Sequence, residues 1–382
     1  MMKSNNKIVS LDELVDILRC AKRIKLYGAG LRLMSFMEMT EEIGMTFLAE
    51  CILVSSNKGN PDTAYGIPVV EVSKASFHKG DVILLTMSDN FVEDAVKKLA
   101  DYGVTENVYE IDYTIIDSMP YRKVYESIES FLKTYPNLES KYNIPVETEK
   151  RYVWTCWWQG EDNAPLLVKK CLESQREHLP EQTEHVIITW ENYRNYIELP
   201  EYLVEKAMSG KIKPAHLADI TRCCLLYKYG GIWLDSTVYL LDELPEECFE
   251  YEIMTRSTGE RIYCTNVSWV TWFLGGRKRE EMFRFIMEAF FSYLSCYDEI
   301  SNYYMIDFLI AISCRELEGI EEKLSKVPIN NVHATQLQKH LHEAFDERAF
   351  RIYTEGGYLQ KLTYKESGYS ENSIYSYLVS AD

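Results

Sequence analysis

The sequence lacks the features that mark membrane, secreted and nucleic-acid-binding proteins. No stretch of its 382 residues approaches the roughly 20 apolar residues of a membrane-spanning helix, so we expect at most peripheral membrane association. None of the ten cysteines forms a Cys-x-x-Cys pair and the chain starts with polar residues, which indicates reduced thiols in a cytoplasmic protein. Positive charge is scarce, with 41 lysines and arginines against 59 aspartates and glutamates. The net charge of −18 therefore argues against a nucleic-acid partner.

Internal repeats and low-complexity tracts are also absent from the sequence. Hydrophobic residues make up 46% and charged residues 26% of the chain, which is typical of a globular protein. The length is sufficient for two domains, each with its own core. We expect a first domain at 1–118, a helical junction at 119–148 and a second domain at 149–382.

Strands and helices alternate along the first domain. Ser10 and Glu13 have the spacing of a capping box at the start of an amphipathic helix, Leu11–Cys20. The alternation predicts a parallel sheet of the Rossmann type. The further predicted elements are strands at 23–27, 47–54, 81–87 and 108–111, and helices at 31–43 and 91–102.

The turn after the first of these strands carries half of a dinucleotide-binding fingerprint. Gly28 and Gly30 are present, but Leu33 stands at the third glycine position. The next strand ends in Ser-Ser-Asn at 55–57, where an NAD-binding unit usually places an acid. The segment also resembles the small Rossmann-like domains attached to bacterial polysaccharide-biosynthesis enzymes. Two interpretations stay open, nucleotide binding and a structural or partner-docking role.

The stretch 216–239 organises the second domain. Apolar residues recur at three- and four-residue steps over its first half, which predicts a helix, and Gly230 suits the left-handed position that ends one. Residues 232–234 are a short apolar run of strand type, and Asp235 stands where that strand ends. Open α/β sheets bind ligands outside the carboxyl ends of their strands, so Asp235 is a candidate ligand-binding residue.

Asp219 and Arg222 lie three residues apart on the predicted helix, so their side chains can share a face. Together with Asp235 they suit a nucleotide-sugar. A strand-end carboxylate can hold a divalent cation on the diphosphate, an arginine fork can grip a phosphate, and a second carboxylate can accept hydrogen bonds from hydroxyls. The alternative is an exposed helix ion pair worth about 0.3–0.5 kcal/mol, with Asp235 merely starting a turn.

A known family carries this pattern. Ala-Asp-Ile-Thr-Arg, followed by Leu-Leu-Tyr-Lys-Tyr-Gly-Gly-Ile-Trp-Leu-Asp-Ser-Thr-Val, resembles the signature of the capsular polysaccharide synthesis protein family. That family is related to glycosyltransferases with Ser-Asp-x-x-Arg and Asp-x-Asp motifs. The similarity runs from about Arg151 to near Lys365, with Trp-Trp-Gln-Gly, Ala-Pro and Leu-Pro-Glu-Tyr segments in the expected order. It implies that a GT-A-type nucleotide-sugar transferase domain follows the Rossmann-like domain.

The resemblance also implies roles for individual residues. It implies that the nucleotide base stacks on a tryptophan after the domain's first strand. Trp157 aligns best with that tryptophan, and Trp158 is a close rival. The alternative is that these tryptophans pack in the core. It makes Asp235 a catalytic residue and the ligand of a divalent cation, Mn²⁺ or Mg²⁺. Thr237 replaces the second acid of the Asp-x-Asp motif, so waters and phosphate oxygens would complete the ion's coordination. The residues implied to contact the nucleotide-sugar are Trp157, Gln159, Asp219, Arg222, Gly231, Asp235 and Thr237.

Two candidates lie outside the signature. Asp307 is a lone acid in the apolar run 303–310, and the family tends to have an aspartate there. Asp307 is therefore a second candidate catalytic residue, as an acceptor-facing group or base, although a buried hydrogen bond to a backbone group or tyrosine fits equally well. The lysines of the run 361–365 can bring positive charge to a diphosphate.

With donor sugar and oligomeric state left open, we expect a glycosyltransferase that uses a nucleoside-diphosphate sugar. Its acceptor would be a capsular or exopolysaccharide or a lipid-linked precursor, in the cytoplasm or at the inner face of the membrane. Two other classes remain. One is a nucleotide-dependent oxidoreductase or sugar-modifying enzyme that uses Gly28 and Gly30. The other is a catalytically silent scaffold of a polysaccharide assembly complex, which Thr237 in place of an acid would suit.

Overall fold

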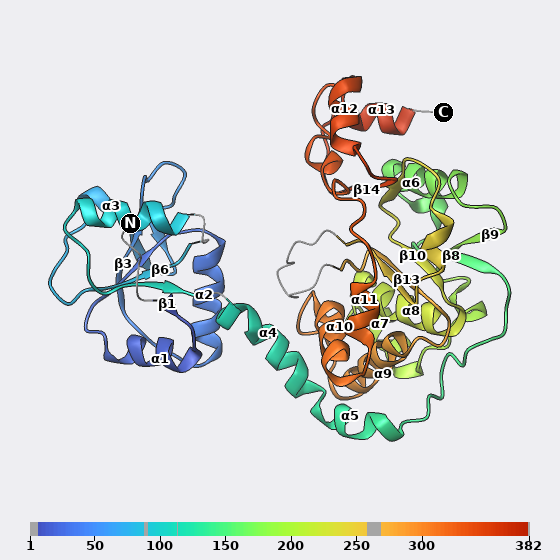
Figure 1. The fold of residues 1–382 in the computed structure, drawn as a ribbon, viewed down its shortest axis with the longest axis horizontal. Coiled ribbons are helices and arrows are strands. Elements are labelled where there is room, and N and C mark those ends of the chain that lie inside the picture. The colour runs from blue at the N-terminus through green and yellow to red at the C-terminus, as the bar shows by residue number, and fades with distance from the viewer. Residues whose placement is uncertain (1–6, 88–90, 113, 258–268, 381–382) are drawn as a thin grey trace. The chain divides into compact units, whose positions relative to one another are not determined.

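The computed structural model describes residues 7–87, 91–112, 114–257 and 269–380. The chain divides into two compact units, Met1–Arg122 and Lys123–Asp382, and each is built around its own main sheet (Figure 1). Both units combine helices with sheets that contain parallel strands, which confirms the predicted α/β class. Among the described residues, no helix has both the length and the apolar character needed to cross a bilayer.

The first unit holds a seven-stranded sheet in the order β1-β7-β6-β2-β3-β5-β4. All neighbouring strands are parallel except β4 and β5, which confirms the Rossmann-like prediction. The strands are β1 (Lys7–Ile8), β2 (Ile24–Tyr27), β3 (Ala49–Val54), β4 (Thr63–Ala64), β5 (Ile67–Glu71), β6 (Val82–Leu85) and β7 (Val108–Ile111). The helices are α1 (Leu11–Cys20), α2 (Leu31–Glu42) and α3 (Val92–Asp101).

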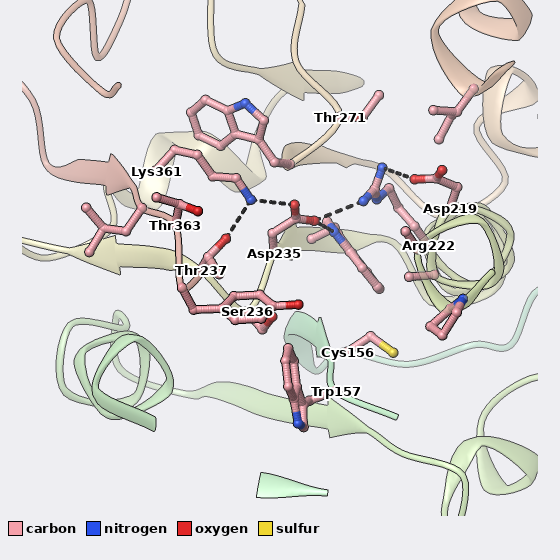
Figure 2. Close-up of a pocket in the computed structure, with 18 of the residues that line it drawn as sticks. Cys156, Trp157, Asp219, Arg222, Asp235, Ser236, Thr237, Thr271, Lys361 and Thr363 are labelled. Carbon is pink, nitrogen blue, oxygen red and sulfur yellow. Dashed lines mark hydrogen bonds and ion pairs between the residues drawn. The ribbon is translucent and has the colours of Figure 1, made fainter. Parts of the chain in front are cut away.

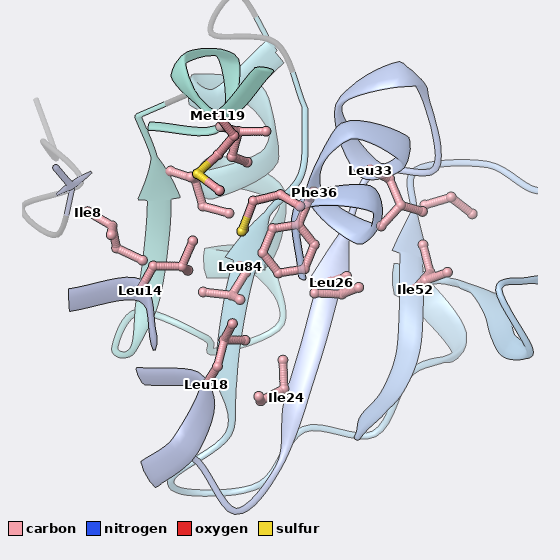
Figure 3. Close-up of a cluster of buried hydrophobic side chains, with 14 of the residues drawn as sticks. Ile8, Leu14, Leu18, Ile24, Leu26, Leu33, Phe36, Ile52, Leu84 and Met119 are labelled. Atoms are coloured by element: carbon pink, nitrogen blue, oxygen red, sulfur yellow. The ribbon is translucent and has the colours of Figure 1, made fainter. Parts of the chain in front are cut away.

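The core of this unit lies on both faces of the sheet, because successive side chains of a strand point to opposite sides. Leu26 and Leu84 pack in one buried cluster with side chains of α1 and α2 (Figure 3). Their chain neighbours Tyr27 and Leu85 pack in a second cluster with side chains of α3. The parallel sheet is thus buried on both sides, as its nearly continuous apolar strands predict.

The helical junction expected at 119–148 begins inside one helix, α4 (Thr114–Ser127), and continues into a second, α5 (Glu129–Thr134). Pro120 lies inside α4, and Ile128 interrupts the helical run between the two. The two units therefore adjoin along the sequence within α4, since the first ends at Arg122.

The second unit is built on a five-stranded sheet in the order β12-β13-β10-β8-β9. β10, β8 and β9 are parallel, whereas β13 runs antiparallel to both β10 and β12. A separate two-stranded antiparallel sheet pairs β11 with β14. The strands are β8 (Arg151–Cys156), β9 (Thr183–Ile188), β10 (Gly231–Leu234), β11 (Val238–Leu240), β12 (Ile253–Thr255), β13 (Phe273–Gly276) and β14 (Leu359–Lys361).

Helices surround this sheet in the second unit (Figure 1). Asp162 and Asn163 are residue types that often cap a helix, but they lie in a short 3-10 turn and the α-helix begins only after Pro165. The helices are α6 (Leu166–Glu177), α7 (Glu201–Met208), α8 (Pro214–Tyr229), α9 (Glu281–Cys296), α10 (Met305–Glu316), α11 (Ile320–Ser325), α12 (Glu347–Thr354) and α13 (Ile374–Ser380).

Candidate functional site

Two neighbouring parallel strands, β8 and β10, end side by side in the second unit. Ile232 of β10 pairs with Val153 of β8, so Asp235 and Trp157 both follow strand ends at the same edge of the sheet. Helix α8 leads into β10 with Gly230 alone between them, and the φ of +73° at Gly230 is a conformation that favours glycine. The predicted helix, turn, strand and strand-end acid thus occur in the predicted order.

Arg222 of α8 joins the two acids of the signature (Figure 2). Its Nη1 donates to Asp219 Oδ1 and its Nη2 to Asp235 Oδ1, each at 2.9 Å. The guanidinium also lies 4.8 Å from the ring centroid of Trp233, and only 4% of the Arg222 side chain is exposed. The exposed helix ion pair considered from the sequence does not occur, because this arginine is buried and shared between a helix and a strand end.

Lys361 approaches Asp235 from the opposite side (Figure 2). Its Nζ donates to Asp235 Oδ2 and to Thr237 Oγ1, both at 2.7 Å. The pairing of β14 with β11 sets this position, since Lys361 lies opposite Val238 in the register. Two cations therefore flank one carboxylate, one on each oxygen.

The charges at Asp235 and Asp219 are balanced differently. Burial alone would raise the pKa of Asp235, but Lys361 and Arg222 outweigh it and hold that pKa well below its usual range. Asp219 has Arg222 as its cationic partner and shares it with Asp235. Burial therefore raises the pKa of Asp219 to about 7, even though the guanidinium opposes the rise. Asp235 is consequently a fixed anion, whereas Asp219 can exchange a proton near neutral pH.

These groups open into a cavity of about 590 Å³. That volume lies within the range of about 300–1,000 Å³ that is usual for small-molecule sites. The cavity brings together nearly all of the predicted site residues, namely Trp157, Gln159, Asp219, Arg222, Asp235, Thr237 and Asp307. Lys361, Lys365, Tyr303 and Tyr304 also line it.

The two rival tryptophans differ in their surroundings. Trp158 is 4% exposed, donates its Nε1–H to the Pro214 carbonyl and packs on Trp190 with ring centroids 4.5 Å apart. Trp157 is half-buried, and its ring meets that of Tyr364 edge-on at 5.5 Å. Of the two, Trp157 is the less buried, and stacking of a base on its ring stays a prediction.

Asp307 lies on α10 at the border of the same cavity. Its Oδ1 accepts a hydrogen bond of 3.1 Å from Trp269 Nε1, and the residue is only 9% exposed. Burial raises the pKa of Asp307 to about 6. The buried hydrogen bond expected from the sequence is present, although its partner is an indole rather than a backbone group or tyrosine. A role as base stays a prediction.

Gly231 does not line the cavity. It begins β10, at the end of the strand remote from Asp235, and a Cβ there would lie 2.4 Å from the Tyr152 carbonyl oxygen. Close strand packing explains this glycine. In the first unit, a Cβ at Gly28 would likewise lie 2.5 Å from the Thr86 carbonyl oxygen, whereas Gly30 has open space around it.

A divalent cation at Asp235 stays a prediction, and the donor set around Asp235 does not fit one as it stands. Mg²⁺ takes six oxygen ligands at about 2.0–2.1 Å. Both carboxylate oxygens of Asp235 already accept hydrogen bonds from cations, and the ammonium of Lys361 lies between Asp235 and the Thr237 hydroxyl. Within the described ranges, no group of three or more His, Cys, Asp or Glu side chains is placed to hold a metal ion.

Some contacts of the site were not predicted from the sequence. Trp233 Nε1 donates to Asp235 Oδ1 at 2.8 Å, and the two-residue spacing that puts both side chains on one face of a strand was the available signal. Gln175 of α6 donates to the backbone oxygens of Asp235 and Val238 at 3.1 and 2.7 Å, which fixes the turn after β10. Nothing in the pattern around Gln175 indicates that role.

Comparison with known proteins adds a family and several relatives. The family model described as capsular polysaccharide synthesis protein matches residues 107–378. An O-glycosyltransferase, PaGT, of Phomopsis amygdali is 30% identical over 159 residues, and the match covers 37% of either chain. The O-glycosyltransferase braB of Annulohypoxylon truncatum is 28% identical over 136 residues, 34% of this chain and 30% of that one. The chain thus spans about a third of the length of these curated relatives, and no solved structure matches it.

Proposed function

The chain belongs to the capsular polysaccharide synthesis protein family, and on that premise we propose that it is a nucleotide-sugar-dependent glycosyltransferase. It moves a sugar from a nucleoside-diphosphate donor onto a cell-surface polysaccharide or its lipid-linked precursor. The reaction takes place in the cytoplasm or at the inner face of the membrane. We further propose that the second unit has the GT-A arrangement and that the cavity around Asp235 holds the donor.

The observation that carries this proposal is the pair of cations on one strand-end carboxylate. Arg222 and Lys361 line the cavity and are held there by Asp235, at the sheet edge where α/β folds bind ligands. The negative charge of a diphosphate must be balanced by nearby positive charge. Because the chain has a net charge of −18, an anionic ligand needs a local positive site such as this one.

The remaining groups fit the other parts of a nucleotide-sugar. The half-buried ring of Trp157 receives the base, because an indole offers a flat apolar face. Asp219 has one oxygen engaged by Arg222 and the other available to accept hydrogen bonds from sugar hydroxyls. Among the relatives, two are named O-glycosyltransferases and a third, from Aspergillus fumigatus, is named glycosyltransferase afumC.

The transfer itself exchanges one C–O bond for another. The bond from the sugar C1 to the phosphate oxygen breaks, and its electron pair stays on the departing diphosphate. A new bond forms between C1 and the oxygen of an acceptor hydroxyl. The proton of that hydroxyl goes to a base, for which Asp307 is the candidate because its raised pKa of about 6 suits proton transfer near neutral pH.

The test is donor turnover and binding by the full chain. All seven tryptophans lie between positions 154 and 272, and Trp157, Trp158, Trp233 and Trp272 line the cavity, so ligand binding should change the intrinsic fluorescence. We expect at least one member of a panel of nucleotide-sugars to bind and to be hydrolysed slowly without acceptor. Asp235→Asn should lower turnover at least about 100-fold.

Asp242→Asn is the matched control, because it removes one charge from an aspartate seven residues later that lies outside the cavity. It should turn over the donor like the wild-type chain. Equal turnover by a folded Asp235→Asn variant would contradict the proposal. Binding of NAD or NADP without binding of any nucleotide-sugar would favour the oxidoreductase class. Binding of neither kind of ligand would favour a scaffold.

A further inference from the structure

Lys361 stands where a metal ion is expected. The Asp-x-Asp motif would hold the ion between two acids, and here the corresponding positions are Asp235 and Thr237. The Lys361 ammonium lies 2.7 Å from an oxygen of each side chain (Figure 2). A divalent ion at this position would meet an ammonium, with like-charge repulsion in a partly buried site.

The backbone of Lys361 is fixed by the fold. The residue ends β14, which pairs with β11, and its own N–H donates to the Ala334 carbonyl at 2.6 Å. The next N–H along the chain, that of Leu362, donates to the Thr237 carbonyl at 2.8 Å. Lys361 and Thr237 are thus tied together through main chain as well as side chain. The ammonium is held in position by the fold before any ligand arrives.

Thr237 suits this arrangement because its hydroxyl is neutral. An ammonium has three N–H donors and needs acceptors, whereas a metal ion prefers charged oxygens. Asp235 and Thr237 take two of these donors, and Lys361 lines the cavity, so the third can reach a ligand oxygen. On the other oxygen of Asp235, Arg222 adds a second fixed cation.

We propose that Lys361 takes the place of the divalent cation, so that the chain binds the diphosphate of its donor without a metal ion. This inference rests on the proposed function. Lys361 donates to a phosphate oxygen in the bound donor and retains this contact as the C1–O bond breaks and negative charge collects on the diphosphate. Threonine at position 237 and lysine at position 361 then belong together. A lysine ammonium needs only a neutral hydroxyl to orient it, so the second acid of the motif is not required.

The experiment measures binding of nucleoside diphosphates to the full chain by calorimetry, in excess EDTA and with Mn²⁺ or Mg²⁺. We expect the wild-type dissociation constant to be the same within about twofold under both conditions. Lys361→Met keeps the side-chain length but removes the charge, and should weaken diphosphate binding about 10- to 100-fold. The corresponding nucleosides, which lack the diphosphate, should bind wild type and variant equally.

Two variants accompany Lys361→Met. Lys339→Met removes a lysine outside the cavity and should leave binding unchanged. Lys361→Arg keeps the charge and should retain most of the binding in EDTA, which guards against a Lys361→Met chain that fails to fold. The double variant Thr237→Asp/Lys361→Met should recover diphosphate binding only when Mn²⁺ or Mg²⁺ is added, because it creates a pair of acids without the ammonium.

The outcomes separate the two proposals. Nucleoside diphosphates that bind the wild-type chain only with metal would overturn the role of Lys361 and leave the proposed function intact. Equal diphosphate affinity of wild type and folded Lys361→Met would overturn it as well. A wild-type chain that binds no nucleoside diphosphate with or without metal would overturn both.

Discussion

Gly231→Ala should destabilise the second unit strongly without touching the cavity. Gly231 has a φ of +98°, which costs other residues about 1–2 kcal/mol. The added Cβ would also lie 2.4 Å from the carbonyl oxygen of Tyr152. Tyr152 cannot retreat easily, because its strand β8 is paired on both sides, with β10 and with β9. Overpacking of this kind costs a further ~1–3 kcal/mol.

Gly210→Ala is the matched control in the same unit. Gly210 has a φ of +79°, but no atom lies within 4 Å of the place that its Cβ would take, so only the conformational cost applies. In both variants alanine also restricts the unfolded chain, which returns about 0.4–1 kcal/mol. We therefore expect losses of about 2–4 kcal/mol for Gly231→Ala and about 0–1.5 kcal/mol for Gly210→Ala.

The assay is urea unfolding followed by tryptophan fluorescence. Because every tryptophan lies in the second unit, the signal reports that unit alone. At urea concentrations below its unfolding transition, the Gly231→Ala variant should still bind nucleotide with wild-type affinity, since the glycine does not line the cavity. Equal losses of stability in the two variants would refute the packing explanation, and a selective loss of affinity in folded Gly231→Ala would restore a direct contact with the nucleotide-sugar.

Two further predictions concern the first unit and Asp307. Gly28→Ala should lower the stability of the first unit by about 2–4 kcal/mol, because its Cβ would meet the Thr86 carbonyl oxygen. Gly30→Ala should cost less than about 1 kcal/mol, because its Cβ would meet no other atom. Equal hydrogen-exchange protection of the first unit in the two variants would contradict this difference. Burial raises the pKa of Asp307 to about 6, above the ~3.9 of an unfolded aspartate, so ionised Asp307 costs stability. Relative to Asp307→Asn, the wild-type chain should lose up to about 3 kcal/mol of unfolding free energy as the pH rises from 4 to 7. A difference between the two unfolding free energies that does not change with pH would disprove this prediction.

The sequence predicted local structure well where several signals agree. Helix α1 begins and ends at the predicted residues, since Ser10 accepts a hydrogen bond from the Glu13 N–H and the apolar stripe is regular. Helix α8, the glycine turn and β10 are found where periodicity and Gly230 place them. Local patterning determines these elements, and the parallel order of β8 and β10 then brings Trp157 and Asp235 to the same sheet edge.

Contacts between distant segments were harder to predict. Lys361 is 126 residues from Asp235, and it arrives through β14, a strand of three residues with little periodicity. The lysine run was therefore noted as a source of charge, but its position between Asp235 and Thr237 depends on the pairing of β14 with β11. The greater burial of Trp158 relative to Trp157 likewise depends on the packing of Trp158 on Trp190, which lies 32 residues further along the chain.

A crystal structure of the full chain with the nucleoside diphosphate that binds it best tests most directly whether the cavity around Asp235 holds the donor. We expect the diphosphate within hydrogen-bonding distance of Arg222 and Lys361, and the base against Trp157. A nucleotide bound instead in the first unit, beside Gly28 and Gly30, with none in the cavity around Asp235, would contradict it.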